Sequence, residues 1–142
     1  MKKSIFILLL APLLFLSACS DDDAAPNNLQ GEPVEGTWKL VNVSGSIAGV
    51  SHDFAAGEVT WTFEENMQMI QIVNNVTDTN TYSGPGSGHY DYENVPNEIT
   101  PQSCTTTIEV GSFLNMGCRD INGNTMVFTQ LEADGYIFTF KR

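Results

Sequence analysis

Apolar and polar residues alternate with a period of two along much of the chain. The stretch VTWTFE (59–64) has an apolar residue at every second position, and so does YIFTF (136–140). Successive side chains of a β-strand point to opposite faces, so this pattern predicts strands with one buried face. After the first 20 residues, no window carries a convincing helical stripe. The pattern therefore predicts an all-β protein.

Turn residues separate the expected strands. Asn122-Gly123 and Asp134-Gly135 are strong two-residue hairpin signals, and they bracket the expected strand at 125–131. The other expected strands are the segments 37–43, 59–63, 67–76, 105–110, 119–121 and 136–140. Seven or eight short strands joined by tight turns, with no long crossovers, predict an antiparallel meander.

The edges of such a sheet decide its architecture. Closing the sheet into a barrel removes both edges, so we expect an antiparallel up-and-down β-barrel of about eight strands. The alternative is an immunoglobulin-like β-sandwich. That fold places a tryptophan between two distant cysteines, whereas Trp38 and Trp61 both precede Cys104 and Cys118.

The first expected strand begins with Gly36-Thr37-Trp38, which resembles the Gly-x-Trp signature of lipocalins and of lipocalin-like domains in bacterial lipoproteins. The resemblance implies a lipocalin-like barrel in which the tryptophan closes one end and a basic residue from near the last strand packs across it. In an eight-stranded barrel the last strand lies beside the first. Lys141-Arg142 is therefore expected close to Trp38, with a cation over the indole face.

The N-terminus has the anatomy of a secretory signal peptide. Lys2 and Lys3 precede an apolar run over 5–16, which is shorter than the ~20 residues of a transmembrane helix. Leu16-Ser17-Ala18-Cys19 resembles the lipobox of bacterial lipoproteins. The resemblance implies cleavage before Cys19 and attachment of palmitate-type acyl chains to it. The alternatives are an uncleaved anchor, or ordinary cleavage that leaves Cys19 as a free thiol.

Four polar residues follow this cysteine. Ser20, Asp21, Asp22 and Asp23 resemble the export tag of surface-exposed lipoproteins of Bacteroidota, which implies an outer-membrane, lipid-anchored protein facing the cell exterior. A simple acidic tether is the alternative reading. We therefore expect a lipoprotein signal peptide at 1–18, a lipidated acidic tether at 19–33 and the barrel domain at 34–142.

Charge restricts the partners of the mature chain. Without residues 1–18 it carries 17 acidic and four basic residues, a formal net charge of −13 at pH 7. Binding of nucleic acid requires a basic face, so nucleic acid is excluded as a partner. Neutral, apolar or cationic partners remain, although acidity also serves solubility.

Two cysteines remain once Cys19 is lipidated. Cys104 and Cys118 are an even pair in an oxidising compartment, and a disulfide between them would staple a hairpin. Two buried free thiols are the alternative. The CxxC spacing of zinc sites is absent, which disfavours a metal pair.

Candidate chemistry is sparse. His89, Asp91 and Glu93 alternate and could form a metal triad on one strand face, but such an alternation is more often a solvent face, and we assign no metal and no cofactor. The glycine-rich stretch 84–88 lacks the features of a phosphate-binding loop and is interpreted as a rim or lid. No Gly-x-Ser-x-Gly elbow occurs, and we expect a protein that is not an enzyme.

Two functions follow. The first is non-enzymatic binding of a small apolar or amphipathic ligand inside the barrel. Its candidate ligand-binding residues are Trp38, Leu40, Trp61, Phe63, Phe128, Phe138 and Phe140. The alternative is a structural or protein-interaction module with a solid core, whose loops at 44–56 and 82–88 contact a protein partner.

Overall fold

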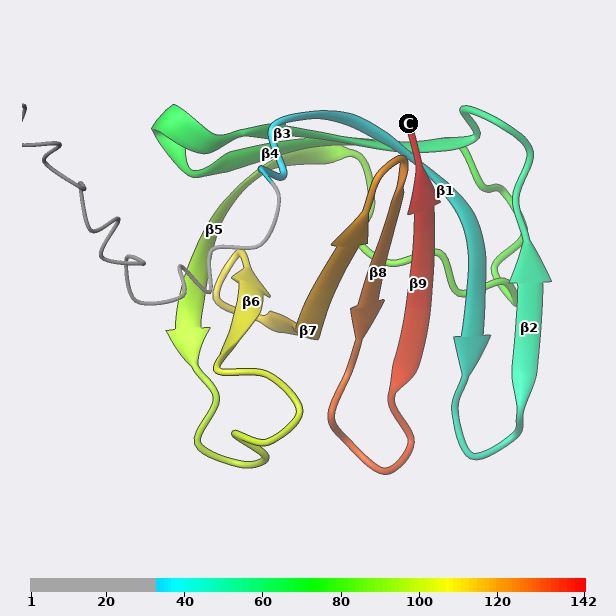
Figure 1. The fold of residues 1–142 in the computed structure, drawn as a ribbon. Helices are drawn as coiled ribbons and strands as arrows, with labels where there is room; N and C mark the ends of the chain where they lie inside the picture. Colours follow the sequence, from blue (N-terminus) through cyan, green and yellow to red (C-terminus); the bar gives the residue numbers. More distant parts are fainter. Residues whose placement is uncertain (1–32) are drawn as a thin grey trace, which may run out of the picture.

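The computed structural model describes residues 33–142, which form nine β-strands and one 3-10 turn, η1 (Glu65–Met67) (Figure 1). The expected signal peptide, Cys19, the tag at 20–23 and the tether up to residue 32 lie outside the described residues. The strands are β1 (Gly36–Gly45), β2 (Val50–Asp53), β3 (Val59–Glu64), β4 (Met69–Asn74), β5 (Gly88–Pro96), β6 (Thr106–Val110), β7 (Leu114–Asn122), β8 (Thr125–Thr129) and β9 (Tyr136–Lys141). No helix in this part of the chain is long and apolar enough to cross a membrane.

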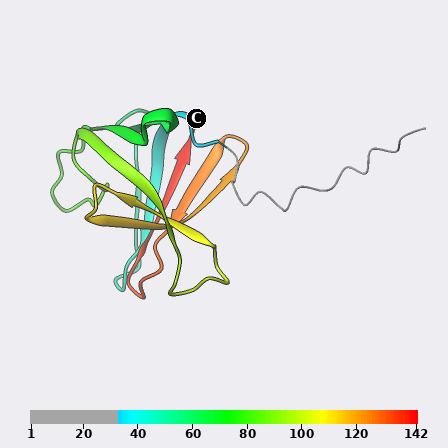
Figure 2. The same ribbon diagram turned by 90° about the vertical axis from the view of Figure 1, so that its left-hand side faces the viewer.

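The strands close into an antiparallel barrel. Their order is β2-β1-β3-β4-β5-β6-β7-β8-β9, and β1 also pairs with β9. Both views show β9 beside β1, where the first and last strands complete the cylinder (Figure 1, Figure 2). Eight strands, β1 and β3 to β9, form an up-and-down barrel, and β2 is an additional strand. This confirms the predicted fold class and leaves no place for the β-sandwich alternative.

Strand β1 has three neighbours because it is long. It pairs with β3 over Gly36–Lys39 and with β2 over Asn42–Gly45, both antiparallel. Its pairing with β9 runs from Lys39 to Gly45 with a register shift between Leu40 and Asn42. A bulge of this kind bends a strand, and a closed barrel requires such bends.

The segment 44–56, expected to be a long loop, contains strand residues at 44–45 and 50–53. It contains the end of β1, a tight turn and β2. The Asn42 side-chain amide donates to Ser51 Oγ (3.1 Å) and to Asp53 Oδ1 (2.8 Å), which ties β2 to β1. The expectation was wrong because β2 reads VSHD and gains its stability from polar pairing, which hydrophobic periodicity does not detect.

The barrel interior is filled by aromatic and aliphatic side chains. The ring of Trp61 lies 5.1 Å from Phe140, 6.2 Å from Phe128 and 6.1 Å from Phe63, measured between centroids. Ring pairs at such distances contribute beyond the area that they bury. The seven side chains expected to face inward are all fully buried: Trp38, Leu40, Trp61, Phe63, Phe128, Phe138 and Phe140.

One end of the barrel is closed around Trp38. Its indole Nε1 donates to the carbonyl of Val34 (2.7 Å), and the Val34 amide donates to Glu65 Oε1 (2.8 Å). The guanidinium carbon of Arg142 lies 4.0 Å from the centroid of the Trp38 ring, and Arg142 Nη2 donates to the carbonyl of Pro33 (3.0 Å). The expected cation over Trp38 is confirmed. We call this region the Trp38 end.

Candidate functional site

The connection between β4 and β5 lies over the interior of the barrel, and we call residues 75–87 the plug. Asn74 holds it in place, because its side-chain amide donates to Ser83 Oγ (2.9 Å) and to the Pro85 carbonyl (2.9 Å). The Asn74 backbone amide also donates to Ser87 Oγ (2.9 Å). Ser83 and Pro85 are buried. The glycine-rich stretch 84–88, expected to form a rim or lid, thus belongs largely to a segment that Asn74 holds by hydrogen bonds. Gly88 begins β5.

Gly84 is the point of closest approach between plug and core. A Cβ atom on this glycine would lie 3.4 Å from Phe138 Cε1 and 3.5 Å from Trp61 Cζ2, and the residue has φ +86°. A Cβ there would be in ordinary van der Waals contact with both rings, whereas an L-residue with a side chain rarely adopts this φ. The plug backbone at Gly84 therefore faces Trp61 and Phe138 with space for a Cβ between them.

Trp61 has an unpaired donor beneath this contact. The side chain is fully buried, and among the described residues its Nε1 has no hydrogen-bond partner. Nε1 is bonded to the same ring carbon as Cζ2, and Cζ2 is the indole atom that would lie within 4 Å of a Cβ on Gly84. A buried donor without a partner costs roughly 1–3 kcal/mol. Such a group in a native protein calls for an explanation.

A surface groove of about 310 Å³ lies beside the plug, and we call it the rim groove. Tyr82 of the plug forms one wall and packs on Tyr136 of β9 with ring centroids 4.5 Å apart. Gln130 braces the opposite wall, since its Nε2 donates to the Asn115 carbonyl (3.1 Å) and its Oε1 accepts from the Tyr136 amide (2.9 Å). The lining residues are Tyr82, Phe113, Leu114, Asn115, Gln130, Glu132, Asp134, Gly135 and Tyr136.

The electrostatic setting of Tyr82 favours the neutral phenol. Burial raises the pKa of Tyr82 above its usual value of 10.0, and the neighbouring Tyr136 raises it further. The ring therefore stays uncharged at physiological pH and presents an aromatic surface to the groove.

The seven side chains expected to bind ligand do not line the rim groove. They are also absent from the lining of three further grooves of 210 to 360 Å³ on the described residues. Only Trp61 and Phe138 of the seven approach the plug. Sequence reasoning did not identify the rim groove, because its residues come from three separate segments and no local motif connects them.

His89, Asp91 and Glu93 are exposed on the outer face of β5, whereas Tyr92 between them is buried. The described residues contain no group of three His, Cys, Asp or Glu side chains arranged to hold a metal ion. The three residues therefore occupy a solvent-exposed strand face, as their alternation in the sequence indicated.

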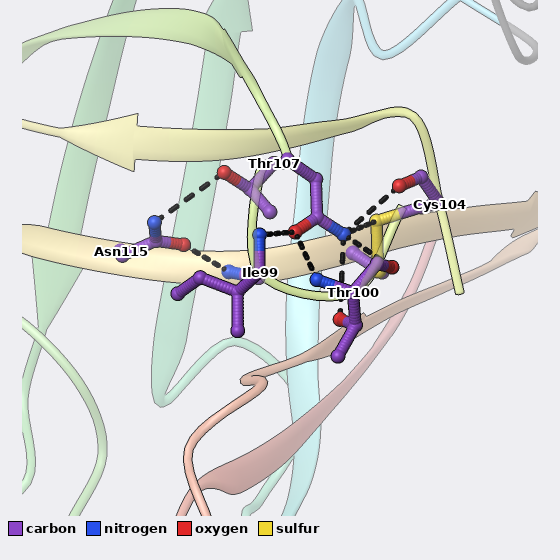
Figure 3. Close-up of a disulfide and its surroundings, with 8 residues drawn as sticks. Ile99, Thr100, Cys104, Thr107 and Asn115 are labelled. Atoms are coloured by element: carbon purple, nitrogen blue, oxygen red, sulfur yellow. Dashed lines mark hydrogen bonds between the residues drawn. A yellow bond between two sulfur atoms is a disulfide. The ribbon is translucent and has the colours of Figure 1, made fainter. Parts of the chain in front are cut away.

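A disulfide joins Cys104 and Cys118, as expected, and links the start of β6 to β7. Figure 3 shows the loop beside it, which Asn97 organises. The Asn97 amide nitrogen donates to the carbonyls of Thr100 (2.8 Å) and Cys104 (2.9 Å), and its oxygen accepts from the amides of Ile99 and Thr100. The bridge fixes the loop on β7.

Arg119 was not singled out by the sequence, yet it is half-buried. It is the cross-strand partner of the fully buried Phe128, so both side chains point to the interior. Burial lowers the pKa of Arg119, while Coulombic attraction to Tyr92 and Glu65 opposes that shift. Its charge is therefore held in a partly desolvated position.

No protein-family model, no curated protein and no solved structure matches this chain. Its class is defined by its own geometry. The described residues form a closed eight-stranded antiparallel β-barrel with a filled interior. One end carries a plug with an unpaired donor beneath it and an aromatic groove at its side.

Proposed function

We propose that this chain is a lipid-anchored, non-enzymatic binding protein on the cell exterior that takes a small amphipathic ligand at the plugged end of the barrel. The unpaired Trp61 donor beneath Gly84 is the observation that carries the proposal. A ligand with an acceptor oxygen supplies the partner that the described residues do not.

The ligand enters by displacing the segment Ser83–Pro85. Its apolar part then packs on Trp61 and Phe138, and its oxygen accepts from Trp61 Nε1. Moving the plug breaks the two hydrogen bonds from the Asn74 side chain, each worth about 1 kcal/mol. A hydrogen bond from the ligand to the indole donor recovers roughly 1–3 kcal/mol. The free energy lost by the plug and the free energy gained by Trp61 are therefore nearly equal, and the apolar contacts of the ligand favour binding.

The anchor and the location rest on the sequence. The lipobox-like segment ending at Cys19 supports attachment to the outer membrane, and the tag of Ser20 and the acidic residues Asp21, Asp22 and Asp23 supports exposure to the medium. More than one acyl chain is needed for stable anchoring. The Cys104–Cys118 bridge fits an oxidising compartment outside the cytoplasm.

The test follows the two indole N–H groups by NMR in residues 20–142 with Cys19 absent, a chain that includes the whole barrel. Trp38 donates to Val34 and serves as the internal reference. Trp38→Phe assigns the two signals. On titration with 2-nonanone, a neutral amphipathic ketone, the Trp61 N–H signal should move downfield as its donor is paired, and the Trp38 signal should not.

Native mass spectrometry of the protein from its parent cell provides the second measurement. A bound small molecule of defined mass supports the proposal. A Trp61 signal that does not respond to the ketone, together with a protein that carries no small molecule, overturns it.

A negative outcome in both measurements favours the second function, a structural or protein-interaction module with a solid core. The filled interior and two exposed apolar side chains, Ile47 (94% exposed) and Phe113 (66%), support this alternative. Crosslinking on intact cells distinguishes the two functions. A protein-interaction module should be recovered reproducibly with a protein partner, whereas a ligand-binding protein requires no such partner.

A further inference from the structure

The rim groove carries charge of one sign. Glu132 and Asp134, on the connection between β8 and β9, are its charged lining residues, and no lysine, arginine or histidine lines it. Both carboxylates are exposed. At physiological pH the groove therefore presents two negative charges.

The basic side chains of the barrel are committed elsewhere. Lys39 and Lys141 are cross-strand neighbours at the Trp38 end, and Arg142 stacks on Trp38. Arg119 points inward beside Phe128. None of these four lines the rim groove, so the part of the chain from residue 33 onward supplies no cation to it.

Aromatic rings form the apolar part of the same groove. Tyr82 and Tyr136 are half-buried and pack on each other, and Tyr82 also lies edge-on to Phe138, with centroids 5.8 Å apart. Phe113 is mostly exposed at the groove. The hydrogen bond from the Tyr136 amide to Gln130 holds the backbone of Tyr136 in place before any ligand arrives. Preorganised walls reduce the entropy lost on binding.

Tyrosine faces combined with carboxylates suit a particular chemistry. The face of an aromatic ring carries negative electrostatic potential and attracts cations, and quaternary ammonium groups are recognised in this way. The carboxylates add Coulombic attraction to the same group and repel an anionic one. A neutral ligand would leave both carboxylates without a charged partner.

We propose that the rim groove binds the ammonium head group of an organic cation. This inference rests on the proposed function, because it assigns a positive head to the amphipathic ligand whose apolar part lies under the plug. Tyr82 belongs to both plug and groove, so head and apolar part occupy adjoining places. The net charge of −13 on the mature chain steers such cations toward the protein and disfavours anions.

The experiment compares choline with its neutral isostere 3,3-dimethylbutan-1-ol in NMR titrations of residues 20–142, following the Gly135 amide. Choline should bind at least about tenfold more tightly than the isostere. The variant Glu132→Gln with Asp134→Asn should weaken choline binding about five- to tenfold. The matched control Asp91→Asn with Glu93→Gln removes the same charge from the outer face of β5 and should change it less than twofold.

Three outcomes overturn the inference. Equal affinities for choline and the isostere mean that the groove selects shape and not charge. An equal effect of the control pair means that only the overall charge of the protein acts. A Trp61 signal that responds to 2-nonanone while Gly135 ignores choline leaves the proposed function standing and removes the cationic head. If neither signal responds and the protein from its parent cell carries no small molecule, both proposals fail.

Discussion

Arg142 stacks on Trp38 with its guanidinium carbon 4.0 Å from the ring centroid, so the last residue of the chain secures the third residue of its first strand. The same guanidinium donates to the Pro33 carbonyl, which brings the start of the described chain into the contact. One side chain therefore links the end of β9 to β1 and to the start of the described chain.

Replacing Arg142 should destabilise the barrel. Arg142→Met keeps the aliphatic stem but removes the cation over the indole and the donor to Pro33, and the free energy of unfolding should fall by about 1–2 kcal/mol. Chemical denaturation measures this. Lys141→Met is the control, since Lys141 is exposed, and it should change stability by less than about 0.5 kcal/mol. Equal losses in the two variants would refute the stacking contribution.

Removing the disulfide should lower the free energy of unfolding by more than replacing Arg142 does. The bridge closes a loop with a sequence separation of 14 residues, for which the chain-entropy estimate is about 3 kcal/mol. The double variant Cys104→Ala/Cys118→Ala should lose stability by about that amount. Adding dithiothreitol should lower the melting temperature of the unaltered protein to a similar degree and leave the variant unaffected. A variant as stable as the parent would contradict the estimate.

Loosening the plug should increase its exchange with solvent. Asn74→Ala removes the donor to Ser83 and Pro85, at a cost of about 1–2 kcal/mol. Hydrogen exchange within 75–87 should accelerate, and 2-nonanone should reach Trp61 faster. Asn80→Ala, which affects only an exposed turn with Asp78, is the control and should leave both rates unchanged. Slower binding in Asn74→Ala would show that the ligand does not enter through the plug.

Neutralising Arg119 should raise stability. Its guanidinium is partly desolvated beside Phe128, and the lowered pKa means that folding disfavours the charged form. Arg119→Met retains the length of the side chain without the charge, and unfolding should require about 1 kcal/mol more. A loss of stability would show instead that attraction to Glu65 and Tyr92 outweighs desolvation.

Alkaline pH should destabilise the fold through Tyr82. Burial raises its pKa above 10.0 in the folded state, so the folded protein holds the phenolic proton more tightly than the unfolded chain does. The resulting stabilisation is complete below pH 10 and is lost as the pH rises through the folded-state pKa. Absorbance at the phenolate band reports the titration. Tyr82→Phe should flatten the decline of stability above pH 10, and an unchanged slope would contradict the assignment.

The sequence predicted those features that depend on local pattern or on closure. Alternation identified the strands that bury Trp61, Phe63, Phe138 and Phe140, and an up-and-down barrel necessarily places Arg142 near Trp38. Strand β2 was missed because it is held by the polar side chain of Asn42. The filling of the interior could not be foreseen, since inward-facing aromatics are equally consistent with a lined cavity and a solid core.

The candidate site was less accessible to sequence reasoning. The unpaired Trp61 donor depends on which edge of the indole meets Gly84, and that is a property of tertiary packing. The rim groove joins the plug, the β6–β7 turn and the β8–β9 connection, which meet only when the barrel closes. The tyrosine pair across it, Tyr82 and Tyr136, is separated by 54 positions, beyond the reach of any short motif.

The hydrogen bond between Arg142 and Pro33 has a geometric consequence for a tethered protein. It gathers the entry and the exit of the barrel at the Trp38 end. Strand β9 then runs from Tyr136 at the rim groove to Lys141, five residues or roughly 17 Å away. The lipid anchor that we propose lies upstream of Pro33, so it would connect to the barrel at the Trp38 end, and the rim groove would lie at the opposite end of β9.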